Sequence, residues 1–362
     1  MSAVVVKVGS SSLTAPSGRI EEQAIVALAS QVAAVTATGR RVVIVSSGAI
    51  SAGLAPLSIE RPSDTTTLQA LAAVGQHRLM SAWDRALAKE GLIGGQVLLS
   101  SFDFGDRRQY LHGKRTLGRL LELGVVPVVN ENDTVADDEI RFGDNDRLAA
   151  LLCPMVSATD LILLTDTPGL LSADPRITPE ASLIEEVEEA DHQRVAALAG
   201  GPGSARGSGG MASKVAAARM AAWSGARAVI AYAGRPGVIS DALDGAAGVG
   251  TVFHPRHDRL PARKLWIAFA LDVQGTLRVD AGAEVAVRRN GSSLLHAGIT
   301  AVEGSFAPQD AVEIWGPSGR LAKGLARQGS AELAVTLARR REGLAVDLDP
   351  VVVHRDDLVL LS

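Results

Sequence analysis

The chain has one cysteine, few aromatic residues and no long hydrophobic run. The single cysteine, Cys153, excludes an internal disulfide framework and a cysteine-rich zinc site, and it fits a reducing compartment. We expect Cys153 to be a small buried side chain. No apolar stretch reaches the roughly 18 to 20 residues of a membrane helix, and the first residues lack the basic and then apolar pattern of a signal peptide. The sequence therefore predicts a cytoplasmic protein with no membrane partner.

Neither sign of charge is in excess. The chain carries 36 basic and 40 acidic residues, for a net charge of −4, so no global field favours nucleic acid or an anionic membrane. A small molecule is the expected partner. With 362 residues, 47% of them hydrophobic, the chain exceeds the length at which a single core usually stops growing. We therefore expect two domains.

Three well-known catalytic and phosphate-binding motifs are also missing. The chain has no GxxxxGK[ST] sequence, because Lys214 follows Gly210 by four positions, and no GxGxxG follows a predicted strand. GxSxG, the motif around the nucleophilic serine of many hydrolases, does not occur either. The sequence thus excludes a P-loop enzyme, an ordinary dinucleotide-binding domain and a hydrolase of the GxSxG type.

Short apolar runs alternate with helical patterns through the first two thirds of the chain. Helical periodicity between these runs ends at Gly39, Gly91 and Gly124. This alternation predicts an α/β fold with an open, mostly parallel sheet, covered by helices on both faces and binding ligands at the carboxyl ends of its strands. The expected strands are residues 4–8, 42–45, 96–99, 125–129, 161–164 and 228–231.

The pattern changes after Phe253. A polar, basic stretch with two prolines predicts a linker, and glycine-punctuated alternating segments such as TLRV (276–279) and EVAVR (284–288) predict strands of a small β-barrel or sandwich. We therefore expect a first domain at 1–256, a linker at 257–273, a β domain at 274–352 and a C-terminal tail at 353–362.

Small and hydroxyl-bearing residues follow the first two strands. Gly9, Ser10 and Ser11 come after the first strand, and Ser47 and Gly48 after the second. Such loops let backbone N–H groups approach an anion, and a following helix points its positive end to the same place. Two neighbouring anion sites are predicted.

Polar side chains cluster after a later strand and before the next helix. Asp144 or Asp146 alone could cap that helix, which is the structural alternative to a binding site. One cap needs one residue, so the larger cluster favours a polar site. Its members are Asn130, Asn132, Asp133, Asn145 and Asp146.

Two lysines stand where cations are unusual. Lys7 interrupts an apolar strand, and a buried ammonium group is costly unless it has an acidic side chain or a bound polyanion as its partner. Lys214 lies in the first turn of a helix that follows the glycine-rich segment 207–210, where a cation is favourable only beside a bound anion. An ordinary solvated lysine is the alternative for Lys214. Together the two lysines indicate a phosphate site.

Seven blocks follow one another through the first domain. They are VVVKVGSSSLT (4–14), VIVSSGAISAG (43–53), LAAVGQHRLM (71–80), VPVVNENDTVA (126–136), FGDNDRLAAL (142–151), LLTDTPGLLSADPR (163–176) and GSGGMASKVAAA (207–218). Together these blocks resemble the amino acid kinase family, and in particular those members that phosphorylate glutamate, and they imply the amino acid kinase fold. Residues 275–306 are similar to the PUA domain that many of these members carry at the C-terminus.

The resemblance implies transfer of the γ-phosphate of ATP to the side-chain carboxylate of L-glutamate, the first step of proline biosynthesis, with Mg²⁺ as cofactor. A glutamate carboxylate, with a pKa of about 4.3, is already ionised at neutral pH and needs no general base. The reaction instead needs positive charge around the transferring phosphoryl group. Lys7 and Lys214 would supply it.

The resemblance also implies a role for each matching residue. The catalytic residues would be Lys7, Lys214 and Asp146, with Asp146 orienting the two lysines. Glutamate would be bound by Ser47, Gly48, Asn130, Asp133, Asp144 and Asn145. ATP would be bound by Lys7, Thr165, Asp166, Ser208, Gly209, Gly210, Met211, Ala212, Ser213 and Lys214. No protein ligand for a metal is assigned, because the nucleotide would hold Mg²⁺.

Two other classes of function stay open on the sequence. One is a kinase of the same fold with another acceptor, such as aspartate, acetylglutamate, carbamate or uridylate; the residues 130–133 and the PUA-like segment argue against it. The other is RNA binding by the PUA-like domain, which the absence of a basic excess and the small number of aromatic residues in that domain do not favour. We expect that domain to have a regulatory or assembly role. The resemblance to the family further implies a homo-oligomer (dimer or tetramer) with proline as a feedback inhibitor.

Overall fold

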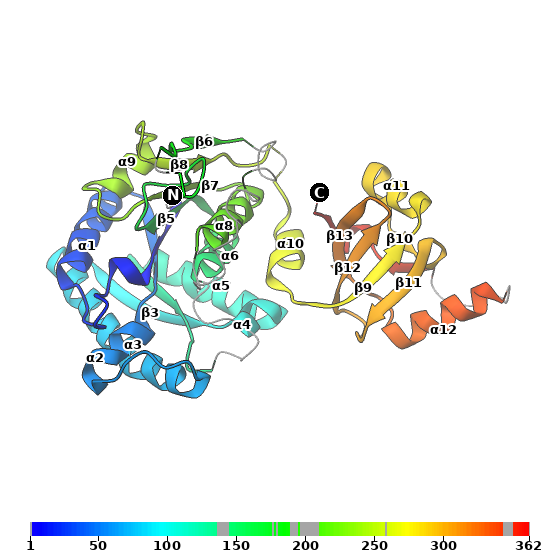
Figure 1. Cartoon of the computed structure of the whole chain (residues 1–362), viewed down its shortest axis with the longest axis horizontal. Coiled ribbons are helices and arrows are strands. Elements are labelled where there is room, and N and C mark those ends of the chain that lie inside the picture. The colour runs from blue at the N-terminus through cyan, green and yellow to red at the C-terminus, as the bar shows by residue number, and fades with distance from the viewer. Residues whose placement is uncertain are drawn as a thin grey trace. The chain divides into compact units, whose positions relative to one another are not determined.

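The computed structural model describes residues 2–135, 145–175, 177–178, 180–188, 195, 210–257, 259–342 and 350–361. The chain divides into two compact units, Met1–Arg259 and Leu260–Ser362 (Figure 1). Among the described residues, every helix is too short or too polar to cross a bilayer.

A mixed sheet of eight strands forms the centre of the first unit. Its order is β3-β4-β2-β1-β5-β7-β8-β6, and all neighbouring pairs are parallel except β7 and β8, which are antiparallel. The predicted open, mostly parallel sheet is confirmed. The strands are β1 (Ala3–Val8), β2 (Arg41–Ser46), β3 (Ile93–Leu99), β4 (Val125–Glu131), β5 (Ala158–Thr165), β6 (Glu186–Val187), β7 (Arg227–Tyr232) and β8 (Gly250–Phe253).

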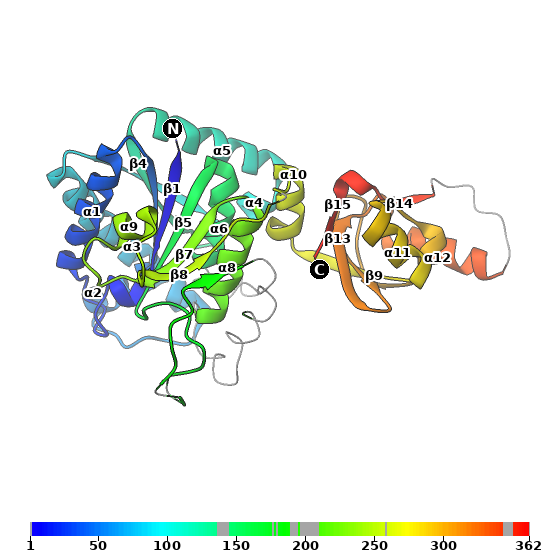
Figure 2. The same ribbon diagram turned by 90° about the horizontal axis from the view of Figure 1, so that it is seen from above.

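Helices cover both faces of this sheet (Figure 2). One face carries α1 (Glu22–Ala37), α3 (Thr65–Lys89) and α9 (Val238–Asp244), whose apolar side chains share one core with Val4, Val6 and Val8 of β1. The other face carries α5 (Arg107–Glu122), α6 (Asn145–Val156) and α8 (Met211–Trp223).

Successive side chains of β1 point to opposite faces of the sheet, as in any strand. Val4, Val6 and Val8 point toward α1, so Val5 and Lys7 point toward the opposite face, where α6 packs on β1. Lys7 is therefore directed at the helix layer that contains α6 and α8, and it is 3% exposed. The cation in an otherwise apolar strand belongs to that layer.

Two further helices begin directly after strands of the sheet, α2 (Ala49–Leu57) after β2 and α4 (Ser101–Gly105) after β3. The helix α2 packs on α3 at two glycines that could not carry a side chain. A Cβ at Gly75 would lie 1.8 Å from the Ala49 carbonyl oxygen, and one at Gly53 would lie 2.2 Å from that of Leu71. The close contact fixes the start of α2, which stands directly after β2. The short helix α4 precedes α5.

The second unit is built on a sheet of five strands in the order β11-β9-β12-β13-β15, with a separate two-stranded sheet β10-β14. Its core includes Leu277, Ile314 and Leu333. The elements are α10 (Ala262–Leu265), the π-helix Trp266–Ala270, β9 (Val273–Val279), α11 (Ala281–Asn290), β10 (Leu294–Leu295), β11 (Ile299–Gly304), β12 (Ala311–Gly316), β13 (Gly319–Leu325), α12 (Ser330–Arg341), β14 (Val351–Val353) and β15 (Leu358–Leu360).

One predicted strand of the second unit is wrong. Residues 284–288 lie in α11, although their alternation indicated a strand. The ends of the helix explain the difference: the Asp280 carboxylate accepts a hydrogen bond from the Ala283 amide at 2.7 Å, and Gly291 ends the helix in the left-handed conformation. Glu284 also pairs with Arg288 one turn later. These end signals outweigh a five-residue alternation.

Candidate active site

A pocket opens along the carboxyl edge of four adjacent strands. Asp133 follows β4, Ser47 follows β2, Gly9 follows β1, and Thr165 ends β5. Since the spatial order of these strands is β4-β2-β1-β5, the pocket crosses them in that order. Its lining residues are Lys7, Gly9, Ser10, Ser11, Ser47, Gly48, Ala49, Ile50, Ser51, Arg61, Asp133, Asn145, Leu164, Thr165, Asp166 and Lys214.

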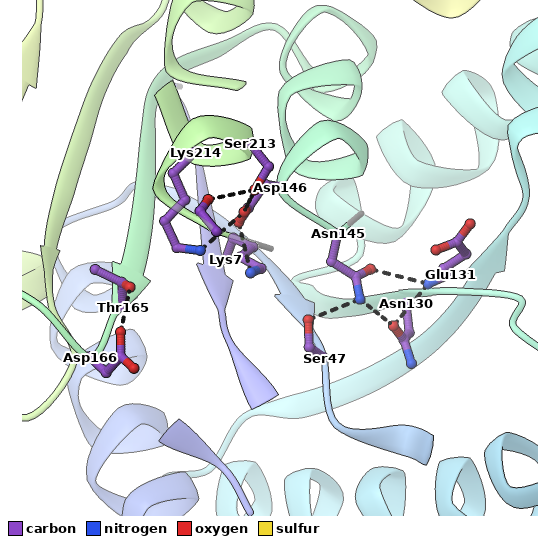
Figure 3. A network of polar contacts seen from close by, with 11 residues as sticks. Lys7, Ser47, Asn130, Glu131, Asn145, Asp146, Thr165, Asp166, Ser213 and Lys214 are labelled. Atoms are coloured by element: carbon purple, nitrogen blue, oxygen red, sulfur yellow. Dashed lines mark hydrogen bonds and ion pairs between the residues drawn. The ribbon is translucent and has the colours of Figure 1, made fainter. Parts of the chain in front are cut away.

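Two lysines meet on one aspartate at the floor of this pocket (Figure 3). The Lys7 Nζ lies 2.7 Å from one carboxylate oxygen of Asp146, and the Lys214 Nζ lies 3.1 Å from the other. Lys7 comes from β1, Asp146 from the first turn of α6 and Lys214 from the first turn of α8. Three elements far apart in the sequence thus place two ammonium groups on one carboxylate.

Charge and burial determine the protonation of Asp146. Burial raises the pKa of its carboxyl group, but the Lys7 and Lys214 ammonium groups and a hydrogen bond from Ser213 more than offset this, so the pKa lies below its ordinary value. The Ser213 hydroxyl lies 2.7 Å from the Asp146 carboxylate. The aspartate is therefore an anion, and the trio formed with the two lysines carries a charge of +1.

Beside this trio, four amide and hydroxyl side chains form a chain of hydrogen bonds. The Asn145 amide donates to the Ser47 hydroxyl at 2.9 Å and to the Asn130 side-chain oxygen at 3.0 Å. The Asn130 amide in turn donates to the Gln76 side-chain oxygen at 2.8 Å. The backbone amide of Glu131 donates to the oxygens of both asparagines. Asn145 is thereby fixed in orientation at the pocket wall (Figure 3).

A buried carboxyl group lies beyond β4. Asp133 is 7% exposed, and one of its side-chain oxygens has no hydrogen-bond partner among the described residues. Burial and the charge of Glu131 raise the pKa of Asp133 to about 7, while Arg61 acts in the opposite direction. A buried carboxylate with an oxygen that lacks a partner is suited to bind a cationic group of a ligand.

Backbone N–H groups also point to the pocket. The residue before α2, Gly48, has φ +110°, a value that side chains disfavour, and the first-turn amides of Ala49, Ile50 and Ser51 have no acceptor within the helix. The helix α8 likewise begins at Met211, with Gly210 as its N-cap. Both helix starts favour a bound anion.

The structure brings most of the predicted site residues to this one place. Lys7, Ser47, Gly48, Asp133, Asn145, Thr165, Asp166 and Lys214 line the pocket. Asn130 and Asp146 are buried directly behind the lining residues. Gly210, Met211, Ala212 and Ser213 form the start of α8. Asp144, Ser208 and Gly209 lie outside the described residues.

Arg61 and Gln76 are among the residues of the site that carry no assignment from the sequence. Arg61 lies in the loop between α2 and α3, where no motif or periodicity distinguishes it. Gln76 is buried in the middle of α3, and its only sequence signal is a polar residue on an apolar helix face. Neither signal indicates a role.

One cluster of possible metal ligands among the described residues lies outside the pocket. Glu186, Glu188 and His254 offer ligand atoms within 4.8 Å of one another, but all three are exposed or partly exposed and none lines the pocket. In the pocket itself, the carboxylate of Asp166 lies at the end of β5, where the Thr165 hydroxyl donates to it at 3.1 Å. Asp166 therefore lies in the same pocket as Lys7 and Lys214.

The chain is similar to known proteins over both units. A model of the amino acid kinase family matches residues 2–232, and a PUA domain model matches residues 275–349. The glutamate 5-kinase of Frankia casuarinae is 48% identical over 365 residues, which cover 99% of this chain and 96% of that relative. The glutamate 5-kinases of Mycobacterium tuberculosis (47% over 367 residues; 99% and 94% covered) and Pseudomonas putida (44% over 363 residues; 99% and 97% covered) are similar to the same extent.

Proposed function

Because this chain belongs to the amino acid kinase family, and its relatives over nearly the full length are glutamate 5-kinases, we propose that the pocket transfers the γ-phosphate of ATP to the side-chain carboxylate of L-glutamate. This reaction is the first step of proline biosynthesis. The observation that carries the proposal is the pair of buried lysines on Asp146, at the centre of the pocket.

The order of the strands supports binding of the two substrates at opposite ends of the pocket. Neighbouring strands lie about 4.8 Å apart, so the end of β4 is roughly 10 Å from β1 and roughly 15 Å from β5. Glutamate fits the β4–β2 end, with its ammonium group at Asp133 and its side chain passing Ser47 and Asn145 toward the lysines. The nucleotide then fits the β1–β5 end, with its γ-phosphate over Lys7 and Lys214.

The chemistry requires positive charge rather than a base. A carboxylate oxygen of glutamate forms a bond to the γ-phosphorus while the bond from that phosphorus to the β,γ-bridging oxygen breaks, and ADP leaves. No proton is removed from the nucleophile, since the glutamate carboxylate is ionised at neutral pH. Lys7 and Lys214 stabilise the charge on the transferring group, and Asp146, which is kept ionised, holds both ammonium groups in place.

The residues at the β5 end fit a nucleotide with its magnesium ion. Mg²⁺ takes oxygen ligands and, when bound with ATP, lowers the repulsion between the phosphates and the incoming carboxylate. Asp146 is already engaged by two ammonium groups, so Asp166 is the available carboxylate at this end. The backbone of Gly9 to Ser11, Gly210 and Lys214 would hold the phosphates, and Thr165 would support Asp166.

An assay of acceptor specificity tests the proposed function. ADP release is measured with L-glutamate, L-aspartate and N-acetyl-L-glutamate as acceptors, for the wild type and for Lys214→Ala. We expect a clear preference for glutamate, because a side chain one methylene shorter would not reach the lysines from Asp133, and we expect an acetylated amine to lose the contact with Asp133. Equal rates on the three acceptors, or full activity of Lys214→Ala, would refute the proposal. Preference for another acceptor would favour the alternative of a related kinase.

The remaining expectations belong to the same proposal. We propose a cytoplasmic homo-oligomer that proline inhibits by feedback, and a regulatory or assembly role for the PUA domain rather than RNA binding. The composition of the second unit, with no excess of basic residues, supports this choice over a reader of nucleic acid backbones.

A further inference from the structure

We propose that Arg61 binds the α-carboxylate of the acceptor amino acid and thereby selects for free α-amino acids; this inference rests on the proposed function and adds a residue to the same site. Arg61 lies in the loop between α2 and α3 and lines the pocket. Its role follows from the one charged group of the acceptor that the other charged side chains of the pocket leave without a partner.

The acceptor offers three charged groups, and charged side chains other than Arg61 match two of them. The side-chain carboxylate must reach Lys7 and Lys214, because phosphoryl transfer takes place there. The ammonium group is matched by the buried carboxylate of Asp133. The α-carboxylate is attached to the same carbon as the ammonium group, so it must lie beside Asp133 and away from the lysines.

Arg61 is the cation in the right place for that group. Arg61 and Asp133 line the same pocket, and the charge of Arg61 lowers the pKa of Asp133, yet the structure records no hydrogen bond or ion pair for Arg61 among the described residues. A guanidinium group and a carboxylate that face one pocket without contacting each other are complementary to a zwitterion placed between them. A guanidinium group also binds a carboxylate through two parallel hydrogen bonds, which gives orientation as well as affinity.

Steady-state kinetics of Arg61→Ala and Arg61→Lys test this assignment. Loss of the hydrogen bonds between two charged groups weakens binding strongly, so we expect the KM for glutamate to rise roughly 10- to 100-fold in Arg61→Ala and less in Arg61→Lys. The kcat and the KM for ATP should change less than about threefold. The control is Arg78→Ala, which removes an exposed arginine of α3 outside the pocket and should leave all constants unchanged.

A ligand without the α-carboxylate separates recognition from a general structural effect. 4-Aminobutyrate keeps the amine and the reacting carboxylate, and its inhibition constant against glutamate should be the same in the wild type and in Arg61→Ala. An unchanged KM for glutamate, a loss confined to kcat, or equal loss of affinity for both ligands would overturn the role of Arg61. Failure of the proposed function would give a different result, because the wild-type enzyme would then release no ADP in response to glutamate.

Discussion

Replacing Asp133 by asparagine should stabilise the ligand-free protein while it impairs the use of glutamate. The carboxyl group is 7% exposed, and its pKa is raised from 3.8 to about 7, chiefly by burial. Each pKa unit corresponds to about 1.4 kcal/mol, so the charged side chain costs the fold up to roughly 4 kcal/mol. Such a cost is expected at a site that must stay ready for a cationic ligand group.

The dependence of this effect on pH follows from the direction of the shift. Since the pKa is higher in the folded than in the unfolded state, the stabilising contribution of the protonated carboxyl is fully present below about pH 4 and is lost as the pH rises through about 7. The asparagine of the variant cannot ionise. The advantage of Asp133→Asn should therefore grow by roughly 3 kcal/mol between pH 5 and pH 8 and stay constant above that.

Denaturant unfolding of the ligand-free protein at pH 5, 6, 7 and 8 measures this advantage directly. The control is Asp84→Asn, which removes an exposed carboxylate from α3 and should give a difference in unfolding free energy that is small and independent of pH. A difference in unfolding free energy between Asp133→Asn and the wild type that did not change with pH would refute this reasoning, and so would an Asp133→Asn variant less stable than the wild type at pH 8.

Four more measurements follow from the structure. The KM for glutamate should rise as the pH falls below about 7, because Asp133 must be ionised to hold the ammonium group; a flat KM profile between pH 6 and 8 would contradict this. In Asp146→Asn, two buried ammonium groups lose their carboxylate, so kcat should fall at least about 100-fold and the unfolding free energy by roughly 3–5 kcal/mol. Gly75→Ala should fail to give stable folded protein, since the new Cβ would overlap the Ala49 carbonyl; a normal melting temperature would argue against the close α2–α3 contact. Asp280→Ala should lower stability by about 1 kcal/mol in chemical unfolding through the lost cap of α11, with kcat unaffected.

The sequence was sufficient for those parts of the site that depend on strand ends. In a parallel sheet the carboxyl ends of adjacent strands share one edge, so Ser47, Asp133 and Thr165 could be predicted to lie along one line. Lys7 was conspicuous because a cation in a buried strand requires a partner, and the structure supplies Asp146. Both inferences use local patterns whose spatial consequence is fixed by the fold.

Other features depend on packing that no local pattern contains. Arg61 enters the pocket only because two tightly packed helices, in contact through Gly53 and Gly75, direct the loop between them. Gln76 supports Asn130 across 54 positions of the sequence, and a helical periodicity does not indicate such a contact. In the second unit, residues 284–288 form part of α11 because the caps of that helix, Asp280 and Gly291, outweigh the short alternation that predicts a strand.

In the proposed reaction, Lys7 and Lys214 hold one phosphoryl group while it moves. A crystal structure of the protein with ADP, L-glutamate, Mg²⁺ and aluminium fluoride would show whether both lysines contact that group, because the fluoride complex imitates it. We expect the Nζ atoms of both lysines within about 3 Å of the fluoride, with Asp146 still between them. A fluoride complex bound away from either lysine would show that the two lysines do not hold the phosphoryl group together.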